Sequence, residues 1–388
     1  MMMFNLAASI FLLSSSSANG FNSPSSPTST VGGVWRTTRS RHIRNNINNS
    51  FFDNVPSSAT ITTTTTSSSS LAASLPISSA ISTVDISRTI IGFLLAQKIS
   101  NSGYKKQSLS KSGAMSAFLV ASLSLATSSR NGLTLLAFYW TSSKLTRVGS
   151  KIKGKLEEGH TEGGERGASQ VFACSLIAVI CACLRRTFVG KDGPLLFFGG
   201  AGLLGDQLTL AYVAFFACCA GDTWASELGV LSKSKPRLII KPWKQVPPGT
   251  NGGISLVGLA ASAAGGTLMG LIHGLLVPGG IASVLPFNLP SLLCAISSAA
   301  FIREVLILSL VGFVGGFGGS LLDSLLGATI QATYYDNEEE KIVKRPGPNV
   351  TKVGGWGFLS NEMVNVVSTA LSALIAALTT RSLLSNMI

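Results

Sequence analysis

The residues best suited to chemistry are two carboxylates associated with long apolar runs. Asp222 follows an apolar run directly, in the sequence GDTWASELG, and Asp323 lies within the apolar sequence LLDSLLGA. A carboxylate in a membrane helix is unfavourable by up to about 2.5 to 3.5 kcal/mol on insertion scales, so a partner or a function is expected. If the two carboxylates converge, they can hold Mg²⁺, which usually binds through one or two carboxylates plus substrate phosphates.

The neighbours of Asp222 on a helix would leave space for a ligand. Asp222, Ser226 and Gly229 repeat at helical spacing, so they form one small, polar face. Glu227 points elsewhere on the same helix. The alternative is that Asp222 and Glu227 are acids at a helix end that only reach interfacial water.

Two further polar faces accompany Asp323. Asp323, Gly327 and Gln331 share a helical face, which again places a small residue beside a carboxylate. Asn361 and Asn365 form a polar face at the start of the last apolar run. In the topology derived below, these faces lie at the same end of the bundle as Asp222.

A basic segment without any acid lies shortly after Asp222. Its cations are Lys233, Lys235, Arg237, Lys241 and Lys244. The turn Thr250-Asn251-Gly252-Gly253 follows, and we expect it to enter a helix at Ile254 and to present backbone N–H groups to an anion. Such a segment suits a phosphate or an anionic headgroup. The alternative is a basic loop that only sets membrane orientation.

The composition predicts the elements that must position these residues. Of the 388 residues, 46% are hydrophobic and only 12% are charged, which excludes a water-soluble globular enzyme of the usual kind. Apolar runs long enough to cross a hydrocarbon layer as helices recur after residue 86. Aromatic residues make up 7%, too few for a nucleic-acid stacking surface, so the net charge of +13 is interpreted as membrane topology and no nucleic-acid partner is expected.

The predicted fold is therefore an all-α, polytopic helix bundle in the lipid bilayer, over residues 84–388. We expect about eight spans, near residues 84–98, 112–128, 131–143, 168–184, 195–220, 253–277, 305–331 and 362–380. Residues 290–302 could form a ninth span, but we expect an interfacial segment there. A ninth span would move residues 336–357 to the other side.

The distribution of Lys and Arg predicts the orientation of the bundle. The loops 98–111, 141–167, 229–252 and 333–360 together carry 19 Lys and Arg, whereas the opposite loops carry 4. By the positive-inside rule, the basic loops should face the cytosol or, in a plastid, the stroma.

Glycine spacing predicts how two of the spans pack. Small residues four apart let helix backbones approach closely in a membrane. The pairs are Gly266/Gly270, Gly312/Gly316 and Gly315/Gly319. We therefore expect the sixth and seventh spans to pack tightly, and we interpret His273, on the sixth span, as a hydrogen-bonded packing residue.

Residues 1–83 have the composition of a targeting leader. A short apolar stretch at 4–13 precedes small residues, and residues 21–84 are rich in Ser, Thr, Asn and Pro with several Arg and one acid. This two-part pattern resembles leaders of algae whose plastids lie inside the endomembrane system. A plastid membrane is the favoured location. The alternatives are a disordered secretory tail and an endoplasmic reticulum or other endomembrane location.

Several motifs in order carry a family resemblance. They are GDTWASELG (221–229), SKSKPRLI (232–239), VPPGTNGGIS (246–255), LLDSLLGATIQ (321–331) and NEMVN (361–365), with EGGERGASQVF (162–172) before them. With these motifs the chain resembles the transmembrane protein 19 family, also called domain of unknown function 92, over roughly residues 86–385. That family is an integral-membrane one, and it includes the plant plastid phytyl-phosphate kinase.

The resemblance implies phosphorylation of a prenyl monophosphate to the diphosphate, with Mg²⁺ and CTP or ATP. A more distant similarity to CTP-dependent dolichol and phytol kinases implies that Asp222 and Asp323 bind the metal and phosphate. It also implies phosphate contacts from Lys233, Lys235 and the turn 250–253. Two alternatives remain: a transporter of an anionic metabolite that uses the same carboxylates as a polar path, and a non-catalytic membrane protein.

Overall fold

The computed structural model describes residues 83–156, 158, 164–196, 201–278, 298–343 and 345–385. The predicted leader lies almost wholly outside these residues, and so does most of the segment 290–302. The chain divides into two units, Met1–Leu75 and Pro76–Ile388, and only the second contains described residues.

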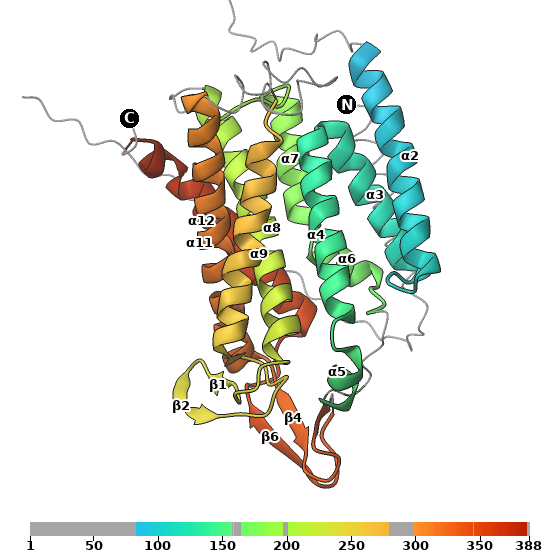
Figure 1. Cartoon of the computed structure of the whole chain (residues 1–388), viewed down its shortest axis with the longest axis vertical. Coiled ribbons are helices and arrows are strands. Elements are labelled where there is room, and N and C mark those ends of the chain that lie inside the picture. The colour runs from blue at the N-terminus through green and yellow to red at the C-terminus, as the bar shows by residue number, and fades with distance from the viewer. Residues whose placement is uncertain are drawn as a thin grey trace, which may run out of the picture. The chain divides into compact units, whose positions relative to one another are not determined.

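The described part of the second unit is mostly helical. Its helices are α2 (Thr83–Lys105), α3 (Lys111–Thr127), α4 (Ser129–Arg147), α5 (Ser150–Leu156), α6 (Ala168–Ala173), α7 (Leu176–Phe188), α8 (Ala201–Gly229), α9 (Leu256–Leu275), α11 (Ala299–Ile330) and α12 (Asn361–Ser385). A helix occupies each expected span, and the fourth is divided into α6 and α7. Figure 1 shows the long helices running alongside one another.

Four of these helices are long and apolar enough to cross a membrane. They are α8, α9, α11 and α12. The prediction of a multi-pass helical membrane protein is therefore confirmed. The number of eight spans stays a prediction.

Glycines bring α9 and α11 together, as the sequence predicts. A Cβ on Gly266 or Gly312 would meet the carbonyl oxygen of the other residue, and a Cβ on Gly270 would overlap the carbonyl oxygen of Leu308. Gly315 and Gly319 instead lie against α8, where a Cβ would meet Ala214 and Cys218, respectively. Backbone contacts of this closeness hold three helices in a fixed register.

A buried network of charged residues joins the other ends of these helices. Arg130 is 1% exposed and donates to Glu304 Oε1 over 2.9 Å and to the carbonyl oxygen of His273 over 2.8 Å. Glu304 Oε2 accepts from the backbone N–H of Leu195, which ties the α7–α8 connection to α11. His273 Nδ1 is hydrogen-bonded to Thr134 Oγ1, so the interpretation of His273 as a bonded packing residue is confirmed.

The connections at the opposite end contain two small sheets, which the all-α prediction missed. β1 (Arg237–Leu238) pairs antiparallel with β2 (Lys241–Gln245) and β3 (Gly253–Ile254). β4 (Thr333–Asp336) pairs antiparallel with β5 (Lys341–Val343) and β6 (Val350–Gly354). The strands are two to five residues long and β2 is exposed throughout, so no hydrophobic alternation signals them.

Two helix boundaries also differ from expectation. The polar stretch GDTWASELG continues α8 to Gly229 rather than following its end. The helix expected at Ile254 begins at Leu256, because Ser255 is its N-cap and accepts from the backbone N–H of Gly258 over 3.1 Å. Asp222 therefore sits about two turns inside a continuous helix, with backbone groups satisfied on both sides.

Candidate functional site

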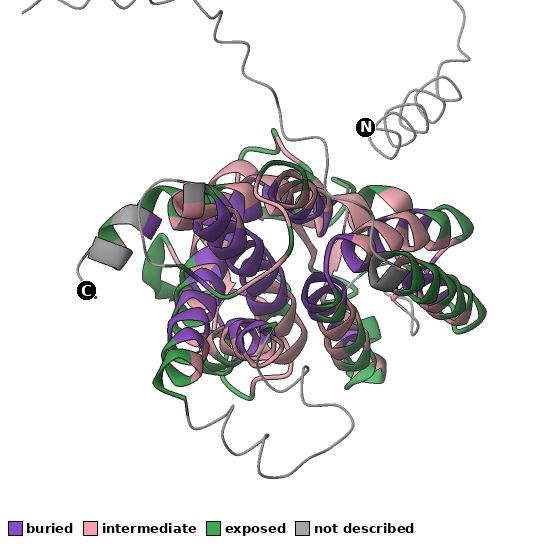
Figure 2. Ribbon diagram, turned by 90° about the horizontal axis from the view of Figure 1, so that it is seen from above, coloured by how far each residue is buried: buried purple, intermediate pink, exposed green. Residues whose placement is uncertain are grey.

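A cavity of about 880 Å³ opens among the helices at the end that carries the basic loops. Figure 1 shows α5 and both sheets at that end, and Figure 2 shows buried residues concentrated along the central helices. Residues of the α2–α3, α4–α6, α8–α9 and α11–α12 connections all line the cavity. The four loops that charge counting placed on one side thus meet at one site.

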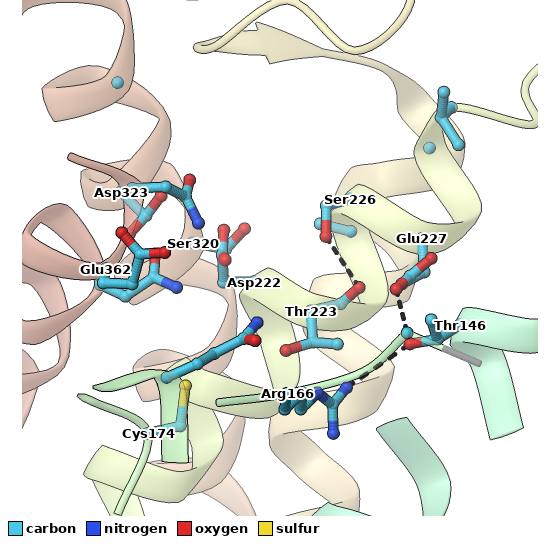
Figure 3. Close-up of a pocket in the computed structure, with 18 of the residues that line it drawn as sticks. Thr146, Arg166, Cys174, Asp222, Thr223, Ser226, Glu227, Ser320, Asp323 and Glu362 are labelled. Atoms are coloured by element: carbon cyan, nitrogen blue, oxygen red, sulfur yellow. Dashed lines mark hydrogen bonds between the residues drawn. The ribbon is translucent and has the colours of Figure 1, made fainter. Parts of the chain in front are cut away.

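The two predicted carboxylates meet in this cavity. Asp222 on α8 and Asp323 on α11 both line it, and their carboxyl groups lie close enough to interact directly (Figure 3). Two carboxylates placed together repel each other unless a cation or a proton lies between them. Their meeting is the geometric condition that the sequence analysis required for a metal–phosphate site.

Helix α12 holds the Asp323 carboxylate in place. Ser368 Oγ donates to Asp323 Oδ2 over 2.8 Å, and the Asn365 side-chain amide lies 3.2 Å from the same oxygen, where its NH₂ group can donate. Asn361, one turn before Asn365, also lines the cavity. Asp323 is only 9% exposed. One of its oxygens is therefore fixed by α12.

The donor set fits a divalent cation only together with a ligand. The described residues contain no group of three or more His, Cys, Asp and Glu side chains arranged to hold a metal ion. Asp222 and Asp323 together supply carboxylate oxygens, and Mg²⁺ typically completes its shell with waters and substrate phosphates. The site thus suits a cation that arrives with phosphate, and it does not suit a metal held by protein alone.

The small and polar residues predicted around Asp222 have mixed roles. Ser226 lines the cavity, and its hydroxyl donates to the carbonyl oxygen of Thr223 over 3.0 Å. Gly229 also lines the cavity, but a Cβ there would crowd Ser255, so this glycine serves the packing of α8 on α9 as well.

The turn 250–253 borders the cavity but uses part of its backbone internally. Asn251 N–H donates to Thr333 Oγ1 over 3.2 Å, and Gly253 N–H donates to the carbonyl oxygen of Thr250 over 2.9 Å. Gly252 has a φ of +75° and presses against α11, where a Cβ would meet the carbonyl oxygen of Ser324. The glycines are thus explained by a close approach of the loop to α11.

The cations at the cavity differ from those the sequence analysis selected. Lys233 and Lys235 are exposed and do not line it. Lys153 and Arg166 line it instead, from the connection between α4 and α6. Lys153 is 4% exposed and pairs with Glu227 over 2.6 Å.

Sequence reasoning also gave no site role to Glu227 and Glu362, which line the cavity. On an α-helix, Glu227 points away from the face that Asp222 shares with Ser226, so the sequence does not group Glu227 with the site. Arg166 lies in a motif that carries the family resemblance, and Lys153 lies in a basic loop that indicates the membrane topology. No spacing rule connects these residues, because they come from elements far apart in the chain.

One part of the cavity wall is apolar. It includes Leu135, Leu136, Phe138, Phe216 and Leu259 from α4, α8 and α9. The site therefore combines six acids and two cations with apolar side chains among the helices. This arrangement suits an amphiphile whose anionic head binds together with a cation.

This fold and site define an integral membrane protein with a polar cavity at one end of a helix bundle. Residues 94–373 match the family described as integral membrane protein DUF92, and the chain belongs to that family. The resemblance to the transmembrane protein 19 family is thereby confirmed.

The chain is similar to several curated proteins. It is 37% identical to Protein PGR of Arabidopsis thaliana over 291 residues, covering 75% of this chain and 96% of that protein. It is 28% identical to an uncharacterized membrane protein of Synechocystis sp. over 250 residues, covering 64% and 72%. It is 26% identical to Protein VTE6, chloroplastic, of Arabidopsis thaliana over 281 residues, covering 72% and 67%. No solved structure matches the chain.

Proposed function

We propose that this protein is a prenyl-phosphate kinase that converts a prenyl monophosphate, such as phytyl phosphate, to the diphosphate. A phosphate oxygen of the substrate would attack the terminal phosphorus of CTP or ATP. The bond between that phosphorus and its bridging oxygen would break, and the nucleoside diphosphate would leave. The observation that carries this proposal is the meeting of Asp222 and Asp323 in a cavity that also has an apolar wall.

Each part of the cavity has a role in this reaction. Mg²⁺ bound by Asp222 and Asp323 would neutralise charge on the phosphates, which is the main catalytic need in phosphoryl transfer. Ser368 and Asn365 fix the Asp323 carboxylate, so little reorganisation is needed when the cation binds. The apolar side chains of α4, α8 and α9 would receive the part of the prenyl chain nearest the phosphate.

The membrane arrangement in this proposal has eight spans. The four candidate spans are joined by four more, formed by α2, α3, α4 and α7. The basic loops would face the cytosol or the stroma. A plastid membrane is the proposed location. The composition of residues 1–83 and the 26% identity to a protein named as chloroplastic support it.

The buried network at the other end favours an enzyme over a transporter. The residues of this network, Arg130, His273 and Glu304, do not line the cavity, and they tie α4, α9 and α11 together. A transporter would have to break buried ion pairs to open a path at that end, and breaking one such pair typically costs about 3 to 5 kcal/mol.

The test is turnover by the purified chain in detergent or liposomes. With phytyl phosphate, Mg²⁺ and either CTP or ATP, the wild type should form phytyl diphosphate, and Asp222→Asn and Asp323→Asn should lower the rate by at least about 100-fold. Lys233→Gln is the matched control, since Lys233 lies outside the cavity. Wild-type activity in Asp222→Asn would reject the proposed role, and solute flux without diphosphate formation would favour the transporter.

A further inference from the structure

Arg166 lines the cavity, and within the described part of the chain its guanidinium group has only weak neutral partners. It donates to Ser143 Oγ over 3.4 Å and to Thr146 Oγ1 over 3.5 Å. Both distances are at the long end for N–H···O hydrogen bonds. Among the ion pairs of the described residues, none involves Arg166. Its positive charge is therefore available to an anion in the cavity.

Glu227 on α8, which shares the Thr146 hydroxyl with Arg166, is already neutralised by another cation. Lys153 Nζ binds Glu227 Oε2 over 2.6 Å and donates to the carbonyl oxygens of Leu145 and Thr146. The hydroxyl of Thr146 donates to the other oxygen, Glu227 Oε1, over 2.6 Å. Because both carboxylate oxygens of Glu227 already have partners, Glu227 does not require an ion pair with Arg166.

The backbone of Arg166 is fixed against the α2–α3 connection. Its N–H donates to the carbonyl oxygen of Ser108 over 3.1 Å, and its carbonyl oxygen accepts from the N–H of Ser110 over 3.0 Å. Gly113 on α3 touches the same carbonyl, and a Cβ at Gly113 would overlap it. The guanidinium is thus held beside the cavity by a rigid backbone anchor.

Arg166 faces the cavity together with the carboxylate pair. In the view of Figure 3, Arg166 and Asp222 lie on either side of Thr223, and all three residues line the cavity. A phosphate that shares a cation with Asp222 and Asp323 still carries oxygens that need donors. A guanidinium presents its N–H groups in the planar fork that matches two phosphate oxygens.

We propose that Arg166 binds the phosphate of the prenyl monophosphate and makes the site selective for the phosphorylated form over the alcohol. This assignment rests on the proposed function. It replaces Lys233 and Lys235, which the sequence suggested for phosphate contact but which lie outside the cavity. Lys153 takes a positioning role, because its pairing with Glu227 leaves Arg166 uncommitted.

The test measures binding separately from turnover. Full-length protein in detergent is titrated with geranyl phosphate and with geraniol. The wild type should prefer the phosphate, and Arg166→Gln should weaken phosphate binding roughly 10- to 100-fold while geraniol binding is unchanged. Arg166→Lys keeps the positive charge but lacks the planar fork of N–H groups, so its affinity for geranyl phosphate should lie between those of the wild type and Arg166→Gln. Lys235→Gln is the matched cation control and should bind like the wild type.

A second pair of variants tests the backbone anchor without altering any cavity side chain. Gly113→Ala should displace the Arg166 carbonyl and raise the KM for the prenyl phosphate more than it lowers kcat. Gly318→Ala is the matched control, because a Cβ at that helical glycine meets nothing within 4 Å. If Arg166→Gln fails to fold, the phosphate preference of Arg166→Lys and of Gly113→Ala is compared with that of the wild type instead.

The outcomes separate this inference from the kinase proposal. Undiminished phosphate preference in folded Arg166→Gln, or no phosphate preference in the wild type, would overturn the inference. A phosphate preference that depends on Arg166, in a protein that forms no diphosphate with any donor, would support the inference and reject the kinase assignment. Diphosphate formation with an unchanged KM in Arg166→Gln would support the kinase and reject the inference.

Discussion

Replacing Arg130 should destabilise the helix bundle more than any exposed substitution. Arg130 is 1% exposed, donates to Glu304 over 2.9 Å and to the carbonyl oxygen of His273 over 2.8 Å, and lies 3.8 Å from Asp192. Asp192 would retain Arg185 at 3.3 Å, but the Glu304 side chain, 3% exposed, would lose its cation. The uncompensated charge is therefore that of Glu304.

The magnitude follows from this burial. Removing one partner of a buried ion pair costs about 3 to 5 kcal/mol, whereas replacing both with apolar residues is often near neutral. With roughly 2 to 4 °C per kcal/mol, the range for domains of about 150 to 250 residues, Arg130→Met should lower the melting temperature by about 10 °C. Arg130→Met combined with Glu304→Met should recover much of that loss.

Thermal unfolding of the purified protein in one detergent provides the measurement. Lys151→Met is the matched control, since Lys151 is exposed, and it should melt within about 1 °C of the wild type. A drop of less than about 2 °C for Arg130→Met would show that the network does not hold this end of the bundle. The same result would remove the argument against a transport path there.

Two further changes test the packing and the site. Gly270→Val should destabilise the protein by about 1 to 3 kcal/mol, because its Cβ would overlap the carbonyl oxygen of Leu308 where α9 contacts α11. Thermal unfolding should show this loss, and a melting temperature equal to that of the wild type would refute the contact. Ser368→Ala should lower diphosphate formation about tenfold and cost about 1 to 3 kcal/mol of stability, because the buried Asp323 carboxylate loses a donor at 2.8 Å. An unchanged rate in the folded variant would mean that this bond does not orient the carboxylate.

The sequence predicted the helices better than the connections. Hydrophobic runs of membrane length locate all the expected helices, since burial in lipid leaves a strong compositional signal. The glycine pairs correctly indicated close packing of α9 on α11. The sequence does not indicate the small sheets, because β1 and β3 have two residues each and are too short for a hydrophobic alternation.

The sequence indicates two of the acids that line the cavity but neither of the cations that line it. Asp222 and Asp323 stand out because an acid is costly in an apolar run, and the structure brings them together. The resemblance to lipid kinases implies phosphate contacts from Lys233 and Lys235, but both residues are exposed and lie outside the cavity. Arg166 comes from a connection more than fifty residues earlier, and only the folded chain places it at the cavity.

The central claim is that Asp222 and Asp323 bind a divalent cation together with the phosphate of a prenyl ligand. Mn²⁺ can replace Mg²⁺ as a probe, and electron paramagnetic resonance counts the bound ion as purified protein is titrated with it. Binding should be weak for the protein alone and should strengthen at least about tenfold when geranyl phosphate is present, and Asp222→Asn should abolish that gain. Equal Mn²⁺ binding with and without geranyl phosphate, or an undiminished gain in Asp222→Asn, would contradict the account.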